Sequence, residues 1–173
     1  MSPFAANVYH VYIFFRVQDT RSMKLTTYTD FGLRTLMYLA TLPEGELTSV
    51  AQVSRLYDIS RNHLVKVVNQ LAREGYLHAV RGKNGGIRLA RSPEEINVGK
   101  VIRALENNLK GVDCGSPACY LVPACRLRDA LRLAMDAFLQ VMEGYTLADL
   151  TGNREELMVI FSQLEVQAGN SSS

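Results

Sequence analysis

Apolar side chains recur at helical spacing in the first well-patterned part of the chain. These residues are Phe31, Leu33, Leu36, Met37, Leu39, Ala40 and Leu42. Most of them fall on one face of a helix, which the pattern predicts to begin near Thr29. Pro43 and Gly45 follow the last apolar position and end the helix, because proline and glycine disfavour its continuation.

Two shorter amphipathic stretches follow, and each has a start signal. Ser49, with Gln52 three residues later, fits a capping box and predicts a helix that ends near Tyr57. Ser60 is a good N-cap for a third helix, which Gly75 closes. Two helices joined by so tight a turn predict a helix-turn-helix.

The third helix has one apolar and one polar face. Its apolar positions are Leu64, Val67, Val68 and Leu71, and its polar positions are Asn62, Lys66, Asn69 and Arg73. The polar face contains no acid, whereas a face that meets only solvent usually mixes both signs of charge. Asn, Lys and Arg can hydrogen-bond to base edges in the major groove, and Ser60, Arg61 and His63 can reach bases or phosphates. We therefore predict that this helix reads DNA.

Two short strands are predicted over residues 76–80 and 87–89. An Asn-Gly pair at Asn84 lies between them and strongly favours a β-hairpin. Arg81 and Lys83 lie beside glycines that allow close approach to a phosphate or to the minor groove. The hairpin is therefore predicted to be a DNA-binding wing; a plain solvated hairpin is the alternative.

The second half of the chain is dominated by one long amphipathic pattern. Its apolar positions are Leu127, Leu131, Ala134, Phe138, Val141 and Tyr145. This near-heptad order suits packing against the chain's own domain or against a second copy. We expect a homodimer, because winged helices commonly bind twofold DNA sites as dimers. Asn97 is expected to cap a helix over 98–106, and residues 149–161 to add one short helix.

The three cysteines of the chain, Cys114, Cys119 and Cys125, fall within twelve residues. Glycine and prolines between them disfavour regular structure, so several sulfurs can face one centre. The spacing departs from the paired motifs of usual zinc sites, whereas iron-sulfur ligation tolerates it. The sequence predicts an iron-sulfur cluster or an incomplete zinc site, with a fourth position for another group. Ordinary thiols are the alternative, and a disulfide would leave one cysteine unpaired.

Charge is distributed unevenly. Residues 24–92 hold ten Lys/Arg and five Asp/Glu, and residues 93–173 hold seven and eleven, so the first half suits a polyanion. The apolar run over 8–17 is too short to cross a bilayer and lacks the flanks of a signal peptide. We expect a cytoplasmic protein without a membrane partner. No nucleophile, base and orienting group are suggested by the histidines or acids, so no enzyme is expected.

The predicted fold class is mainly α with a small β-wing. Residues 23–92 are expected to form a winged helix-turn-helix DNA-binding domain, and residues 93–150 a cluster-binding loop and a dimerisation helix. Residues 151–173 are expected to hold a C-terminal helix and a disordered tail over 169–173. Residues 1–22 are expected to be an extension outside the fold.

Several of these stretches also carry a family resemblance. They are LTTYTDFGL (25–33), SRNHLVKVVNQL (60–71), VRGKNGGIRL (80–89), PACRL (123–127) and YTLADL (145–150). In this order the chain resembles, over about 23–150, the NsrR type of the bacterial winged-helix iron-sulfur regulators, the family that also contains IscR. The IscR branch has a longer first gap between cysteines and a histidine soon after the third, and no histidine follows Cys125 here.

The resemblance implies a homodimeric repressor with one 2Fe-2S or 4Fe-4S cluster per subunit, held by Cys114, Cys119 and Cys125. Nitric oxide would attack the cluster and release DNA at nitrosative-stress genes. Asp30 of the partner subunit is the implied fourth ligand, with Glu106 in reserve. Alternatively, Asp30 only complements the helix dipole or pairs with its own chain.

Other functions stay open at this point. An IscR-like sensor of iron-sulfur supply or oxidative stress would share the architecture. An electron-transfer or cluster-carrier protein would leave the basic wing and the recognition helix unexplained. A zinc-stabilised interaction module is the last option.

Overall fold

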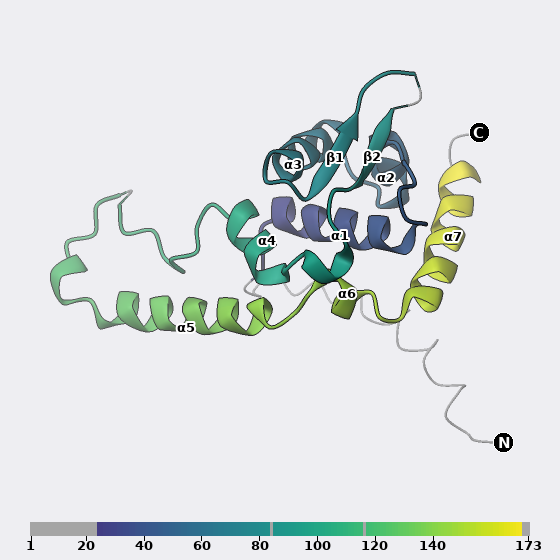
Figure 1. Cartoon of the computed structure of the whole chain (residues 1–173). Coiled ribbons are helices and arrows are strands. Elements are labelled where there is room, and N and C mark those ends of the chain that lie inside the picture. Colours follow the sequence, from purple (N-terminus) through teal and green to yellow (C-terminus); the bar gives the residue numbers. More distant parts are fainter. Residues whose placement is uncertain (1–23, 84, 116, 171–173) are drawn as a thin grey trace.

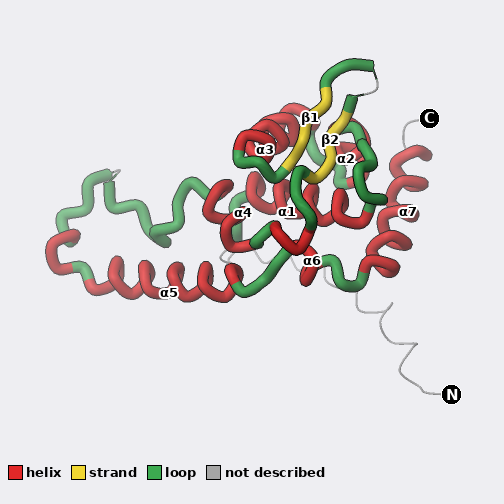
Figure 2. Tube along the Cα trace, in the orientation of Figure 1, coloured by secondary structure: helices red, strands yellow, loops and turns green. Residues whose placement is uncertain are grey.

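The computed structural model describes residues 24–83, 85–115 and 117–170. The described helices are α1 (Thr27–Thr41), α2 (Val50–Leu56), α3 (Arg61–Arg73), α4 (Val98–Leu105), α5 (Arg126–Glu143), α6 (Leu147–Leu150) and α7 (Arg154–Asn170). The strands are β1 (Leu77–Val80) and β2 (Gly86–Leu89), and short 3-10 turns span Pro93–Glu95 and Val122–Ala124. This confirms a mainly helical fold with a small β-wing (Figures 1 and 2). The predicted extension over 1–22 and the predicted turn residue Asn84 lie outside the described residues.

α1 begins slightly before its predicted start near Thr29 because Thr26 caps it. The Oγ1 of Thr26 accepts a hydrogen bond from the backbone N–H of Thr29 at 3.3 Å. The last turn of α1 holds no basic residue. Arg154 of α7 instead donates to the carbonyl of Thr41 at 2.9 Å, which places a cation at the negative end of the helix dipole.

The capping box predicted for α2 forms only in part. Ser49 Oγ accepts from the backbone N–H of Gln52 at 3.0 Å, as expected of an N-cap. The side-chain amide of Gln52 is instead directed to the hydroxyl of Tyr38 at 3.2 Å and to Glu165 Oε1 at 3.0 Å. Gln52 therefore ties α2 to both α1 and α7.

The prediction of one short helix over 149–161 is wrong. α6 ends at Leu150, and Thr151 folds its hydroxyl back to donate to the carbonyl of Leu147 at 2.9 Å. α7 then runs on to Asn170. It includes residues 169 and 170, which the sequence assigns to a disordered tail; residues 171–173 lie outside the described part.

α7 has an aromatic anchor that no short-range pattern could show. The ring of Phe161 packs edge-on against Tyr38 and Tyr57, with centroids 5.2 and 6.1 Å apart. Such pairs add to the free energy gained from burying the ring. The C-terminal helix therefore packs on α1 and α2.

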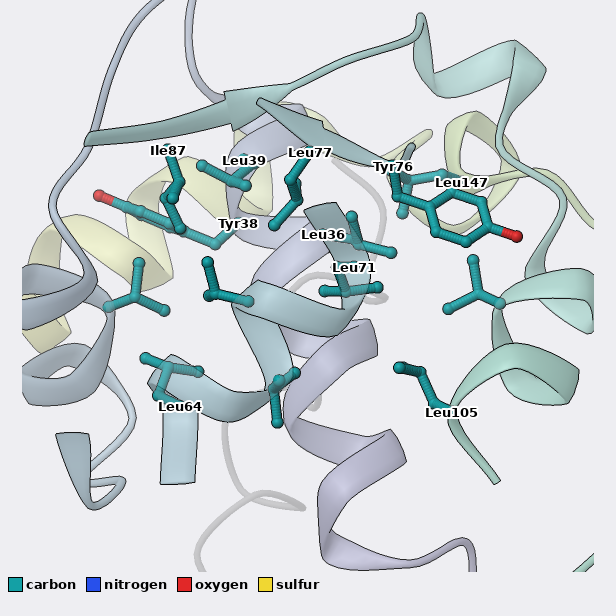
Figure 3. Close-up of a cluster of buried hydrophobic side chains, with 14 of the residues drawn as sticks. Leu36, Tyr38, Leu39, Leu64, Leu71, Tyr76, Leu77, Ile87, Leu105 and Leu147 are labelled. Carbon is teal, nitrogen blue, oxygen red and sulfur yellow. The ribbon is translucent and has the colours of Figure 1, made fainter. Parts of the chain in front are cut away.

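The main core lies between α1, α3, the hairpin, α4 and α6 (Figure 3). Its central residues, each at most 2% exposed, are Leu36, Leu64, Leu71, Leu77, Ile87, Leu105 and Leu147. These side chains come from six elements, so the core fixes which face of α3 turns outward.

α5 and the loop before it extend from this body as an arm (Figures 1 and 2). Leu139 is the one buried residue of α5, and it packs with Val98 and Ile102 of α4. Asn97 caps α4 as predicted, since its Oδ1 accepts from the N–H of Lys100 at 3.0 Å. Its amide also donates to the carbonyl of Glu143 at 2.7 Å, which fixes the base of the arm.

Candidate DNA-reading surface and cysteine loop

α3 turns the predicted DNA-binding residues outward. Arg61, Asn62, His63, Lys66 and Asn69 are all exposed, whereas Leu64, Val67, Val68 and Leu71 are buried. Ser60 occupies the N-cap position as predicted, but its side chain makes no capping hydrogen bond. Its exposed hydroxyl therefore lies with the cations and amides at the helix start.

Gln70 also belongs to α3, yet its amide is bound within the protein. Its Nε2 donates to the carbonyl of Ala104 in α4 at 2.6 Å, and its Oε1 accepts from the hydroxyl of Tyr28 in α1 at 2.8 Å. The same hydroxyl lies 3.0 Å from the carbonyl oxygen of Lys66. Burial raises the pKa of Tyr28 more than Arg73 lowers it, so the hydroxyl keeps its proton.

The cysteine loop starts beside the first turn of α1. Glu106 ends α4, and its Oε1 accepts from the backbone N–H of Thr26, the N-cap of α1, at 2.6 Å. Glu106–Thr26, Tyr28–Gln70 and Gln70–Ala104 together form what we call the α1–α3–α4 contact set. It joins the start of the cysteine loop to α3, the helix that is predicted to read DNA. Sequence reasoning missed these roles of Tyr28 and Gln70 because no local signal marks them.

The wing is confirmed as an antiparallel hairpin with Arg81 and Lys83 exposed near its tip. Gly82 has a φ of +113°, and a Cβ there would meet nothing within 4 Å. A Cβ on Gly86 would lie 2.6 Å from the carbonyl oxygen of Thr48. A side chain at Gly86 would therefore collide with the base of the wing, whereas the space around Gly82 is open, as the predicted DNA-binding role requires.

The three cysteines lie in the loop between α4 and α5 as half-buried free thiols. The hydrogen bonds of this segment are short-range, such as that from the N–H of Cys119 to the carbonyl of Cys114 at 3.1 Å. Cys125 is the N-cap of α5, and its Sγ accepts from the N–H of Arg128 at 3.4 Å.

The three sulfurs do not converge on one point. Among the described residues, no three His, Cys, Asp or Glu side chains are grouped so that they could hold a metal ion. Cys114 lines an open hollow of about 840 Å³ with Asp113 and Arg132, whereas Cys125 lines another of about 390 Å³ with Tyr120. The donor set nevertheless fits an iron-sulfur cluster, which thiolates hold. Gathering the thiols needs no break in a strand or α-helix, because the loop is held by short-range bonds.

Asp30 lies in the first turn of α1 and is bound within its own helix. Its Oδ1 accepts from Nε of Arg34 at 2.9 Å, and about half of each side chain is exposed. This is the alternative interpretation of Asp30 from sequence, and both it and the helix dipole account for an acid here. Ligation of a partner's cluster by Asp30 stays a prediction.

The arm exposes much of its predicted apolar stripe. Large exposed apolar residues on and just after α5 are Leu127, Leu133, Val141 and Tyr145. Leu133 lies outside the predicted stripe. Of the remaining stripe positions, Leu131 and Phe138 are half-buried and Ala134 is exposed. An apolar stripe left uncovered by its own chain is typical of a protein interface.

This architecture is similar to that of known proteins. A family model described as Rrf2, iron-dependent transcriptional regulator, matches residues 25–153. IscR from T. potens is 26% identical, with a TM-score of 0.62, over 79% of this chain and 91% of that chain. CymR from S. aureus, in its oxidized form, is 27% identical with a TM-score of 0.59 over 74% and 95%. CymR from B. subtilis, described as the global cysteine regulator, is 25% identical with a TM-score of 0.53 over 76% and 98%.

Rrf2 regulators bind DNA and typically dimerise. Within the described residues, no helix is long and apolar enough to cross a membrane. The family match spans the winged helix, the cysteine loop and the arm. The chain therefore belongs to the Rrf2 family of transcriptional regulators.

Proposed function

We propose that this Rrf2 regulator is an iron-sulfur-dependent repressor that senses nitric oxide. It releases DNA on cluster nitrosylation and thereby controls nitrosative-stress genes. The observation that carries the proposal is the position of the cysteine loop. It holds three free thiols and begins at Glu106, whose carboxylate binds the start of α1.

Cys114, Cys119 and Cys125 would hold one 2Fe-2S or 4Fe-4S cluster in each subunit of a homodimer. When bound, the cluster supplies iron, to which nitric oxide binds strongly. The partner subunit's Asp30 would provide the fourth ligand from an exposed first turn. A carboxylate is a harder and more labile iron ligand than a thiolate, which suits a position that must open.

The α1–α3–α4 contact set gives the signal a route to DNA. A rearranged cysteine loop displaces Glu106 and with it the cap of α1. Tyr28 lies in that first turn, so its hydrogen bond to Gln70 of α3 then changes. A tenfold change in DNA affinity needs about 1.4 kcal/mol, and each hydrogen bond contributes roughly 0.5–1.5 kcal/mol net. Loss of two of these contacts is therefore enough.

Anaerobically purified protein tests the proposal directly. We expect a brown protein with iron and acid-labile sulfide, and gel shifts in which nitric oxide abolishes specific DNA binding. Cys119→Ala should lose the cluster and keep its far-ultraviolet circular dichroism. Leu121→Ala is the matched control, because Leu121 is 70% exposed in the same loop and has no donor atom.

Three results would contradict the proposal or a part of it. A colourless protein that holds only zinc would show that the protein has no iron-sulfur cluster. Unchanged DNA affinity after nitric oxide treatment of the brown protein would show that nitric oxide is not the signal. A cluster retained by Cys119→Ala would remove that cysteine from the ligand set.

A second candidate function is an IscR-like sensor of iron-sulfur supply or oxidative stress. The structural similarity to T. potens IscR favours it. In that case cluster-free protein, or protein treated with peroxide, would change its DNA affinity, whereas nitric oxide at equal iron loading would have no additional effect. An electron-transfer or cluster-carrier role leaves the acid-free face of α3 without a use.

A further inference from the structure

Val65 is an apolar residue on the polar face of α3. The other large apolar residues of this helix, Leu64, Val67, Val68 and Leu71, are at most 3% exposed, whereas Val65 is 38% exposed. Arg61 and Asn69 lie one helical turn away from it on either side. Single exposed apolar residues are common on protein surfaces. Val65 differs because its neighbours on this face are amides and cations.

Folding explains a valine here only in part. Val65 stands outside the buried core cluster and keeps 38% of its surface exposed, and β-branched residues are weaker helix formers than Ala, Leu or Lys. The major groove offers one apolar group on base edges, the C5-methyl of thymine. Asn62 and Asn69 lie on the same exposed face and can hydrogen-bond to adjacent base edges.

We propose that Val65 contacts a thymine methyl and selects a T·A pair at one position of each DNA half-site. The chemistry is complementary, because cytosine lacks the methyl and presents an amino donor in its place. This inference depends on DNA reading by α3 and not on the identity of the signal.

The test uses the full chain in whichever state, metal-loaded or metal-free, binds DNA more tightly. An operator is selected from random duplexes, and each thymine is then replaced singly by deoxyuridine, which removes only the methyl. Wild-type protein should lose about fourfold in affinity at one symmetric position, as expected for one buried carbon. Val65→Ala removes the contact from both half-sites, so it should lose about sixteenfold on the unmodified operator and be insensitive to deoxyuridine at that position.

The matched control is Val159→Ala, since Val159 is 56% exposed on α7. It should bind every duplex as the wild type does. Val65→Ala should melt close to wild type, because the better helix propensity of alanine offsets the loss of a partly covered side chain. Full methyl sensitivity of Val65→Ala at every thymine would overturn the proposal, and so would a wild type that is insensitive to every deoxyuridine.

Discussion

At the scale of single residues, the hydroxyl of Tyr28 holds α3 to α1. Tyr28→Phe removes this donor from Gln70 Oε1 and keeps the ring. We expect a loss of about 1 kcal/mol in the free energy of unfolding, measured in urea. We also expect a several-fold smaller difference in DNA affinity between cluster-loaded and cluster-free protein, measured by fluorescence anisotropy.

Tyr57→Phe is the control, because the hydroxyl of Tyr57 donates to the carbonyl of Arg34 at 3.1 Å, outside the α1–α3–α4 contact set. If Tyr28→Phe loses stability but keeps the full difference in DNA affinity, Tyr28 has only a structural role. If wild-type protein itself shows no such difference, the proposed sensor function fails instead.

The residues that sequence could predict are those whose signals are local. Ser49 and Asn97 cap helices through partners three residues away, and Gly75 ends α3 with a φ of +74°. Glu106 was predicted only as a reserve ligand. Its bond to Thr26 joins residues 80 positions apart, and no pattern along the chain marks such a contact.

At the scale of elements, α7 braces α1 and α2 through a buried tyrosine. Tyr38 donates to Glu165 Oε1 at 2.8 Å. Burial, together with the bond to Glu165 and its charge, raises the pKa of Tyr38 to about 12. The unfolded chain releases this proton near pH 10, so the stabilisation is complete below pH 10 and is lost as pH rises towards 12.

Denaturant unfolding between pH 9 and 11.5 measures how much the protonated Tyr38 stabilises the fold. Each such tyrosine makes the free energy of unfolding fall by up to about 1.4 kcal/mol per pH unit above pH 10. Tyr57, whose pKa burial also raises, adds to the fall. In Tyr38→Phe, the free energy of unfolding should fall less steeply with pH than in the wild type, by about the contribution of one tyrosine. Parallel curves would mean that Tyr38 titrates normally.

The wing is an element with a separate readout, the dependence of DNA binding on salt. Arg81→Ala and Lys83→Ala should each reduce the slope of log affinity against log salt by about 0.9, the value for one phosphate contact. Lys100→Ala, an exposed change on α4, should leave the slope unaltered. An unaltered slope in both wing variants would mean that the wing does not touch DNA.

The elements also show where sequence patterns stop being informative. The long stripe over 127–145 predicts α5 because helical periodicity needs no knowledge of the partner. α7 was predicted too short, because Phe161 and Arg154 act on α1 and α2 from the far end of the chain. The cysteines were found by composition, but where their sulfurs lie depends on a loop that, beyond Glu106, has short-range hydrogen bonds among its described residues.

At the scale of the whole molecule, we expect the arm to pack against a second copy. Val141 is 61% exposed on the apolar stripe of α5, and Val141→Glu would place a charge in the expected interface. We expect sedimentation to change from dimer to monomer. Affinity for a two-half-site operator should fall at least tenfold, because linked reading helices bind the second half-site at high effective concentration. Val159→Glu on α7, where Val159 is 56% exposed, is the control, and a Val141→Glu dimer would place the interface elsewhere.

If the partner subunit supplies a ligand, retention of the cluster depends on dimerisation. Variants of Asp30, the proposed ligand, test this dependence. Asp30→Asn removes both the carboxylate and the ion pair with Arg34. Arg34→Gln breaks the same pair but keeps the carboxylate, so it is the matched control. We expect Asp30→Asn to release iron to a chelator several-fold faster while remaining a dimer, and Arg34→Gln to behave as wild type. Monomeric Val141→Glu should reproduce the fast release, because no second copy then offers its Asp30. Equal release from Asp30→Asn and Arg34→Gln would assign Asp30 to the ion pair and the helix dipole alone.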